Sequence, residues 1–123
     1  MMICEAFAVV DVPFPFSDVP RSKRRKALVL SERAFNERNG ASILMMITSA
    51  IGSAWYRDVA LEEWAAAGLR KPCVARPKLF TLDNRLISAQ VGELAASDRR
   101  AVALALQGSI PLLDDGAASG PRG

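Results

Sequence analysis

The stretch with the most evident chemical potential is residues 21–26 (RSKRRK), in which five of six residues are cationic. A guanidinium group presents a planar fork of donors that binds two phosphate oxygens at once, which an ammonium group cannot do. The apolar residues 27–30 follow directly and predict a buried strand that anchors the basic stretch in a sheet. Such a cluster is the electrostatic footprint of a polyanion-binding site. The alternative for a basic run is a solvated loop that leads into a strand.

Aromatic and further basic side chains lie downstream of this stretch. Single-stranded nucleic acid is recognised by stacking of bases on aromatic planes and by cations along its backbone. Trp55 and Tyr56 are the best candidates for stacking, with a role in a protein interface as the alternative. Arg76 and Lys78 are candidates for backbone contacts, with solvated surface charges as the alternative.

The composition excludes several kinds of site. The chain has 123 residues, a net charge of +3 and no histidine. A histidine acid–base pair, a Ser-His-Asp triad and a histidine-ligated zinc are therefore excluded. Cys4 and Cys73 match no metal spacing and are expected as reduced thiols. We expect no metal and no cofactor.

The elements that must position these side chains are short strands with Gly and Pro between them, followed by one helix. This pattern predicts a mainly β fold with a helix, as a small antiparallel barrel or sandwich. The strands are predicted at 6–12, 27–31, 42–47, 58–61, 78–82 and 86–91. Residues 32–40 are predicted as a polar turn region, and residues 62–67 as one or two helical turns. Ser97 is the predicted N-cap of a final helix that runs to about Gln107.

The length indicates a single domain, residues 1–113, with a flexible tail at 114–123. No apolar window is long enough to span a membrane, and the N-terminus lacks the basic region of a signal peptide. We therefore expect a cytoplasmic protein with no membrane partner.

Several sequence blocks occur in an order that resembles the MazF/PemK family of toxin–antitoxin toxins. The blocks extend over about residues 6–113: VPFPFSD at 12–18, KRR at 23–25 leading into ALVLS at 27–31, ITS at 47–49, GLRKP at 68–72, KLFTLD at 78–83 and VGEL at 91–94. The resemblance implies an SH3-like antiparallel β-barrel with a C-terminal helix, usually a homodimer. The apolar character of Trp64, Met45 and Met46 also favours a dimer.

The family implies an activity and the residues that carry it. Its members are generally metal-independent endoribonucleases that cut single-stranded RNA and are silenced by an antitoxin. The resemblance implies that Arg25 and Thr48 are the active-site pair. Further RNA contacts are predicted for the basic neighbours and the residue after Thr48, namely Lys23, Arg24, Lys26 and Ser49. The alternatives are a protein-binding gyrase poison like CcdB and an inactive member that only binds RNA or its antitoxin.

The sequence departs from the family pattern in three places, which involve four residues. Phe7-Ala8 stands where the family commonly has Gly-Asp, and Phe80 where many members have Arg. Lys26 stands where the family commonly has Pro directly after the active-site Arg, which frees the local backbone.

The general base is not identified by the sequence. Asp11, Asp18 and Asp83 are the three candidates for it.

Overall fold

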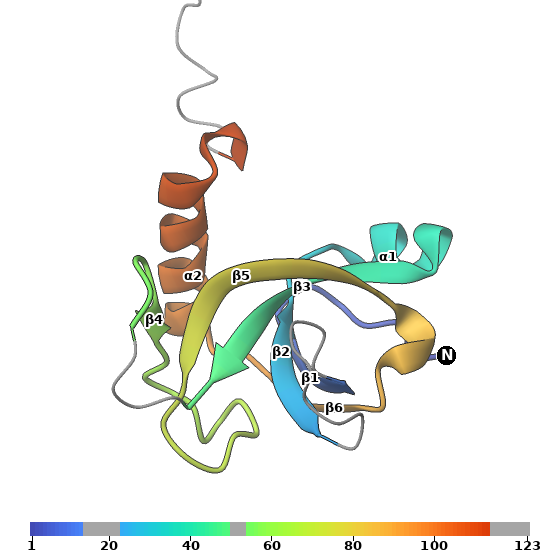
Figure 1. Ribbon diagram of the computed structural model, residues 1–123, viewed down its shortest axis with the longest axis horizontal. Helices are drawn as coiled ribbons and strands as arrows, with labels where there is room; N and C mark the ends of the chain where they lie inside the picture. The colour runs from blue at the N-terminus through green and yellow to red at the C-terminus, as the bar shows by residue number, and fades with distance from the viewer. Residues whose placement is uncertain (14–22, 50–53, 114–123) are drawn as a thin grey trace, which may run out of the picture.

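The computed structural model describes residues 1–13, 23–49 and 54–113 (Figure 1). Six strands form one antiparallel sheet in the order β4-β5-β3-β2-β1-β6, which curls into a half-barrel. The strands are β1 (Ala8–Pro13), β2 (Arg24–Val29), β3 (Ala41–Thr48), β4 (Val59–Ala60), β5 (Val74–Asp83) and β6 (Ala89–Glu93). The helices are α1 (Arg33–Asn39) and α2 (Ala96–Ser109), with 3₁₀ turns η1 (Asn84–Leu86) and η2 (Pro111–Leu113). The predicted mainly β, barrel-like fold with a C-terminal helix is confirmed.

Each face of the sheet packs against its own hydrophobic cluster, because successive side chains of a strand point to opposite faces. On one face, Val9 and Leu28 pack with Val102 and Leu106 of α2. The other face buries a second set of strand residues, among them Val10, Val12, Ala27, Val29 and Leu44. The curled sheet therefore has two buried faces, and each strand residue belongs to one or the other.

The strand β2 begins earlier than the sequence predicts. Arg24, Arg25 and Lys26 pair with Pro13, Val12 and Asp11 of β1, in that order. The predicted start of this strand at residue 27, with the cations before it outside the sheet, is therefore wrong, because the ladder with β1 continues through them. Similarly, the predicted strand at 78–82 is part of the longer β5, whose pairing with β3 is interrupted by a bulge.

Residues 33–39 form the helix α1, where the sequence predicts a polar turn region. The helix is short and polar, and its only buried residue is Asn36. The Asn36 side chain donates to the carbonyl of Cys4 at 2.9 Å, which ties α1 to the N-terminal segment. Gly40 ends the helix in the left-handed conformation, φ 69°, which glycine adopts without steric cost. The helix therefore depends on a tertiary contact that no local apolar pattern reveals.

The helix α2 begins at Ala96 with Ala95 as its N-cap, so the prediction of Ser97 as the cap is wrong. Asp98 in the first turn is buried, and its two carboxylate oxygens accept the backbone N–H groups of Glu62 and Glu63 at 3.0 and 2.9 Å. The predicted helical turns at 62–67 are present as hydrogen-bonded turns: the backbone N–H of Ala67 donates to the carbonyl of Glu63 at 3.2 Å, and Gly68, with a φ of 87°, ends them. The hydrogen bonds of Asp98 therefore connect this region to α2.

The apolar residues from which a dimer was predicted, Met45, Met46 and Trp64, lie largely in the interior of the protomer. Met45 and Met46 are 0% and 4% exposed within the protomer, and Trp64 packs partly buried against the first cluster. These residues consequently provide no argument for a second copy. The predicted tail, 114–123, lies outside the described residues. In the part of the chain that the structure describes, no helix is long and apolar enough to cross a membrane.

Candidate nucleic-acid interface

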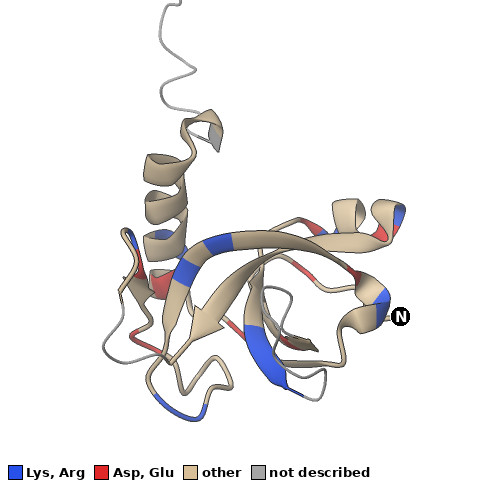
Figure 2. Cartoon of the chain, in the orientation of Figure 1, with Lys and Arg blue, Asp and Glu red and all other residues tan. Residues whose placement is uncertain are grey.

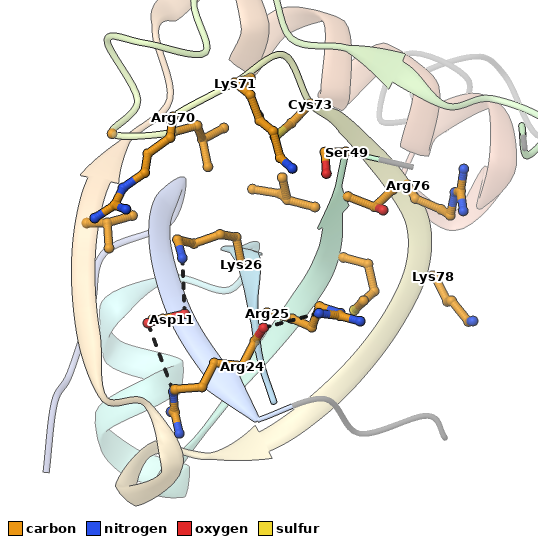
Figure 3. Close-up of a pocket in the computed structure, with 16 residues that line it drawn as sticks. Asp11, Arg24, Arg25, Lys26, Ser49, Arg70, Lys71, Cys73, Arg76 and Lys78 are labelled. Atoms are coloured by element: carbon orange, nitrogen blue, oxygen red, sulfur yellow. Dashed lines mark hydrogen bonds and ion pairs between the residues drawn. The ribbon is translucent and has the colours of Figure 1, made fainter. Parts of the chain in front are cut away.

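A cavity of about 860 Å³ opens at the end of the sheet where β2 begins and β3 ends (Figure 3). Its lining includes seven cationic side chains, from β2, β5 and the segment 68–73: Arg24, Arg25, Lys26, Arg70, Lys71, Arg76 and Lys78. Figure 2 shows the corresponding concentration of Lys and Arg on β2, β5 and the loop before β5. Asp11 is the only carboxylate among the described residues that line the cavity. The cavity is thus strongly positive, as an anionic ligand requires.

The sheet register brings Arg25 and Thr48 together. Lys26 of β2 pairs with Ile47 of β3, so the next position along the antiparallel ladder places Arg25 opposite Thr48. Because side chains alternate between the two faces of a sheet, Arg25 shares a face with Ala27, and Thr48 shares a face with Met46. Ala27 and Met46 are paired, so Arg25 and Thr48 lie on the same face. Both residues line the cavity. A guanidinium group and a hydroxyl group therefore emerge side by side at the mouth of the half-barrel.

The same alternation separates Arg25 from its basic neighbours. Arg24 and Lys26 share the opposite face of β2, and both pair with Asp11, at 3.9 Å (Nε to Oδ2) and 3.3 Å (Nζ to Oδ1). In Figure 3 these three side chains lie on one side of β2, whereas Arg25 points to the other side, toward β5. The predicted single basic patch is therefore divided in two. We call these parts the Arg25 side (Arg25, Thr48, Arg76, Lys78) and the Asp11 side (Asp11, Arg24, Lys26, Arg70, Lys71).

On the Arg25 side, an ion pair organises the aromatic candidate. Asp58 accepts two hydrogen bonds from Arg76, at 3.1 Å (Nε) and 2.9 Å (Nη2), and one from the backbone N–H of Trp55 at 2.9 Å. The Trp55 ring lies 5.8 Å from the Arg76 guanidinium carbon and 5.3 Å from Lys78 Nζ. Trp55 remains 44% exposed. Arg76 and Lys78 thus hold an accessible indole beside the cavity through cation–π contacts.

The other predicted contact residues are placed differently. Ser49 lines the cavity directly after Thr48. Tyr56 is 83% exposed, does not line the cavity, and stacks under Arg57 at 4.9 Å. Lys23 is exposed just before β2 and also lies outside the lining.

The sequence of this chain matches one known protein family over most of its length. The family model described as "PemK-like, MazF-like toxin of type II toxin-antitoxin system" matches residues 5–110. The chain belongs to this family. The predicted resemblance is thereby confirmed over nearly the whole chain.

Solved structures of MazF toxins have the same fold as this family member. MazF from Deinococcus radiodurans has a TM-score of 0.71 at 25% identity, over 90% of this chain and 99% of that one. The MazE–MazF complex from the same organism has a TM-score of 0.70 at 23% identity, over 89% and 97%. Mycobacterium tuberculosis toxin MazF-mt6 has a TM-score of 0.68 at 20% identity, over 85% and 96%. A search of curated proteins gave no match.

The departures from the MazF/PemK pattern have visible structural consequences. Phe7 adopts a φ of 71°, a conformation that favours the glycine common at this position in the family. Its ring packs against the first core cluster and under Arg99 at 5.3 Å, and these contacts offset the strain. Lys26, in place of the usual Pro, forms the ion pair with Asp11 across the β1–β2 ladder.

The candidates for a general base in this toxin are reduced by the structure. Asp83 lies at the opposite end of the β3–β5 ladder from Thr48, seven residue pairs or roughly 20 Å away, so this candidate is wrong. Hydrogen bonds from Arg85 lower the pKa of Asp83 to about 2, which also makes it a poor base. Asp11 lies across β2 from Arg25 and is engaged by two cations. Asp18 lies outside the described residues.

Three residues that line the cavity were not predicted from the sequence to belong to a site. Arg70 and Lys71 line the cavity from the segment 68–73, and Cys73 follows them. Burial raises the pKa of the Cys73 thiol, and the charges of Lys71 and Lys26 act on it in the opposite direction. The sequence feature that could have indicated this part of the site is the pair of adjacent cations, Arg70 and Lys71, between Gly68 and Pro72. Among the described residues, no group of three or more His, Cys, Asp or Glu side chains could hold a metal ion.

The lowered pKa of Asp58 predicts how the stability of the fold depends on pH. Burial would raise its pKa, but the hydrogen bonds from Arg76 and Trp55 and the charge of Arg76 more than offset this, and the pKa lies below its ordinary value of 3.8. A lowered folded-state pKa means that the carboxylate stabilises the fold above pH 3.8, and that this contribution disappears as the pH falls through the lowered value. Asp58→Asn should therefore lower the free energy of unfolding at pH 7 by about 1.5–3 kcal/mol, the range for hydrogen bonds to charged groups.

The measurement is urea unfolding of wild type and Asp58→Asn between pH 7 and pH 2. The difference in unfolding free energy between the two proteins should be constant at neutral pH and shrink below about pH 4. A difference that stays constant throughout this range would contradict the role of the Asp58 charge.

Proposed function

We propose that this toxin is a metal-independent, sequence-specific endoribonuclease that cuts single-stranded RNA. The observation that carries the proposal is the placement of Arg25 opposite Thr48 at the mouth of a cationic cavity, in a member of the MazF/PemK family. No histidine is present, so the proposal assigns the largest part of the catalysis to electrostatic stabilisation and hydrogen bonds and none to a histidine acid–base pair.

The reaction is an internal transesterification. The 2′-oxygen attacks the adjacent phosphorus, the P–O5′ bond breaks, and the products carry a 2′,3′-cyclic phosphate and a 5′-OH. The proton lost by the 2′-OH is balanced by the proton gained by the leaving 5′-oxygen. Arg25 donates to the phosphoryl oxygens, where negative charge increases in the pentacovalent transition state. Thr48 donates a hydrogen bond to a phosphoryl oxygen or orients the 2′-OH.

Substrate binding in this proposal uses the remaining cavity residues. Cations along the cavity neutralise phosphates, and the exposed face of Trp55 stacks a base. Ser49 and Lys78 lie within reach of the same strand of RNA, and Lys23 and Tyr56 extend the contact surface outside the cavity. Arg76 acts chiefly through its contacts with Asp58 and Trp55.

The biological setting follows from the family. We propose that the toxin acts in the cytoplasm as a homodimer and is neutralised by a cognate antitoxin. The similarity to MazF in MazE–MazF complexes supports an antitoxin partner.

The decisive test is incubation of the purified protein with a long single-stranded RNA in excess EDTA. We expect discrete cleavage products whose 5′ ends accept phosphate from polynucleotide kinase without prior phosphatase treatment, because they carry 5′-OH groups. Arg25→Ala, purified in parallel, controls for contaminating nucleases. Cleavage that requires added divalent metal would contradict the mechanism. No cleavage together with inhibition of DNA supercoiling by gyrase would instead support the CcdB-like alternative.

A further inference from the structure

We propose that the Asp11 side of the cavity is a second anion subsite, which binds a non-scissile phosphodiester of the RNA whose scissile phosphate lies at Arg25. This inference rests on the proposed function for the identity of the ligand. It assigns a binding role to Arg70 and Lys71, and a positioning role to Asp11.

The charge of the Asp11 side favours an anion. Four cations, Arg24, Lys26, Arg70 and Lys71, line this part of the cavity together with a single carboxylate, Asp11. Of these four cations, Asp11 forms ion pairs with the two on β2, at 3.9 and 3.3 Å. The Asp11 side chain is 23% exposed. Its single negative charge orients these two side chains and leaves the site as a whole positive. Three positive charges remain in excess, and a phosphodiester bound there would offset one of them.

The segment that carries Arg70 and Lys71 is held in place by backbone packing. A Cβ on Gly68 would lie 2.1 Å from the carbonyl oxygen of Val91, and one on Gly92 would lie 2.2 Å from that of Ala67. Leu69 is buried in the first hydrophobic cluster, on the face of the sheet that carries Lys26. Arg70 and Lys71 themselves are exposed. The segment therefore presents two solvated cations to the cavity from a rigid anchor.

The continuity of the cavity favours RNA over an unrelated anion. Both sides of β2 line one cavity, and only the end of the strand lies between them (Figure 3). A single strand carries one negative charge per nucleotide, so an RNA with one phosphate at Arg25 has further phosphates that can cross the end of β2. The guanidinium forks of Arg24 and Arg70 suit phosphate oxygens. The subsite thus makes recognition depend on nucleotides that flank the cleaved bond.

The test compares Arg70→Ala/Lys71→Ala with Arg38→Ala/Arg100→Ala. The control removes the same charge from exposed positions of α1 and α2 outside the cavity. The substrates are a minimal oligonucleotide around a cleavage site mapped with wild type, and the same sequence extended on its 5′ or 3′ side. For the extended substrate, the cavity variant should raise KM about tenfold with kcat unchanged, because it loses ground-state binding. Its salt slope should flatten by about 1.4, at about 0.7 per contact.

With the minimal substrate, the cavity variant should have the same KM and salt slope as wild type. The control variant should match wild type with both substrates. The proposal is overturned if the cavity variant processes the extended substrate with wild-type KM and salt slope. It is also overturned if that variant loses only its binding to a poly-glutamate peptide, since the subsite would then serve an acidic protein segment.

Failure of the proposed function can be distinguished from failure of the subsite. If wild type cuts no RNA, equilibrium binding of 2′-O-methyl RNA of two lengths to the same proteins replaces the kinetic readout. Stronger binding of the longer RNA that disappears in the cavity variant supports the subsite. Equal binding by the cavity variant and wild type overturns it.

Discussion

Arg25→Ala should lower the rate of RNA cleavage by about 10²–10³, which corresponds to about 2.7–4 kcal/mol of transition-state stabilisation. The guanidinium group should bind the pentacovalent transition state more strongly than the ground-state phosphodiester. The affinity for uncleaved RNA should fall much less, because six other cations line the cavity. Single-turnover cleavage and equilibrium binding of a non-cleavable 2′-O-methyl RNA separate these two effects.

Neighbouring variants sharpen this experiment. Arg25→Lys should restore little activity, because one ammonium group cannot reproduce the bidentate fork. Arg24→Ala removes an equal charge one residue away, but on the other side of β2, so it should raise KM far more than it lowers kcat. Arg38→Ala on α1 controls for net charge. Cleavage by Arg25→Ala at the wild-type rate would refute the catalytic role.

Gly68→Ala should destabilise the fold by about 2–5 kcal/mol. The backbone of Gly68 has a φ of 87°, which costs an L-residue about 1–2 kcal/mol, and the new Cβ would lie 2.1 Å from the carbonyl oxygen of Val91. Overpacking of this kind typically costs a further 1–3 kcal/mol, and a backbone atom cannot move aside by changing rotamer. Denaturant unfolding measures the loss.

Two other glycines separate the two contributions. Gly40→Ala introduces the same type of backbone strain, φ 69°, with nothing within 4 Å of the new Cβ. It should therefore cost only the 1–2 kcal/mol of the backbone conformation. Gly92→Ala should show the steric contribution alone, since its Cβ would lie 2.2 Å from the carbonyl oxygen of Ala67. Equal losses for Gly68→Ala and Gly40→Ala would contradict the close backbone contact.

The sequence by itself determined the sheet and the final helix. Short runs such as 27–29 and 42–47 carry their apolar pattern locally, and both lie within strands of the structure. The order of the sequence blocks identified the family, because several blocks in one order are far more specific than any single motif. The candidate pair Arg25 and Thr48 came from that resemblance. Their juxtaposition depends on the β2–β3 register, which the composition of the two segments did not reveal.

Only the tertiary structure decided how the charges are distributed. The extension of β2 through Lys26 comes from its ladder with β1, a pairing between residues distant in sequence, and strand alternation then divides the cations between two sides. α1 depends on buried hydrogen bonds of Asn36, and the turns at 62–67 depend on Asp98 of α2. Arg70 and Lys71 reach the cavity because Gly68 and Gly92 allow two backbones to touch. Contacts of this kind join segments far apart in the chain, so no local pattern of propensity or hydrophobicity encodes them.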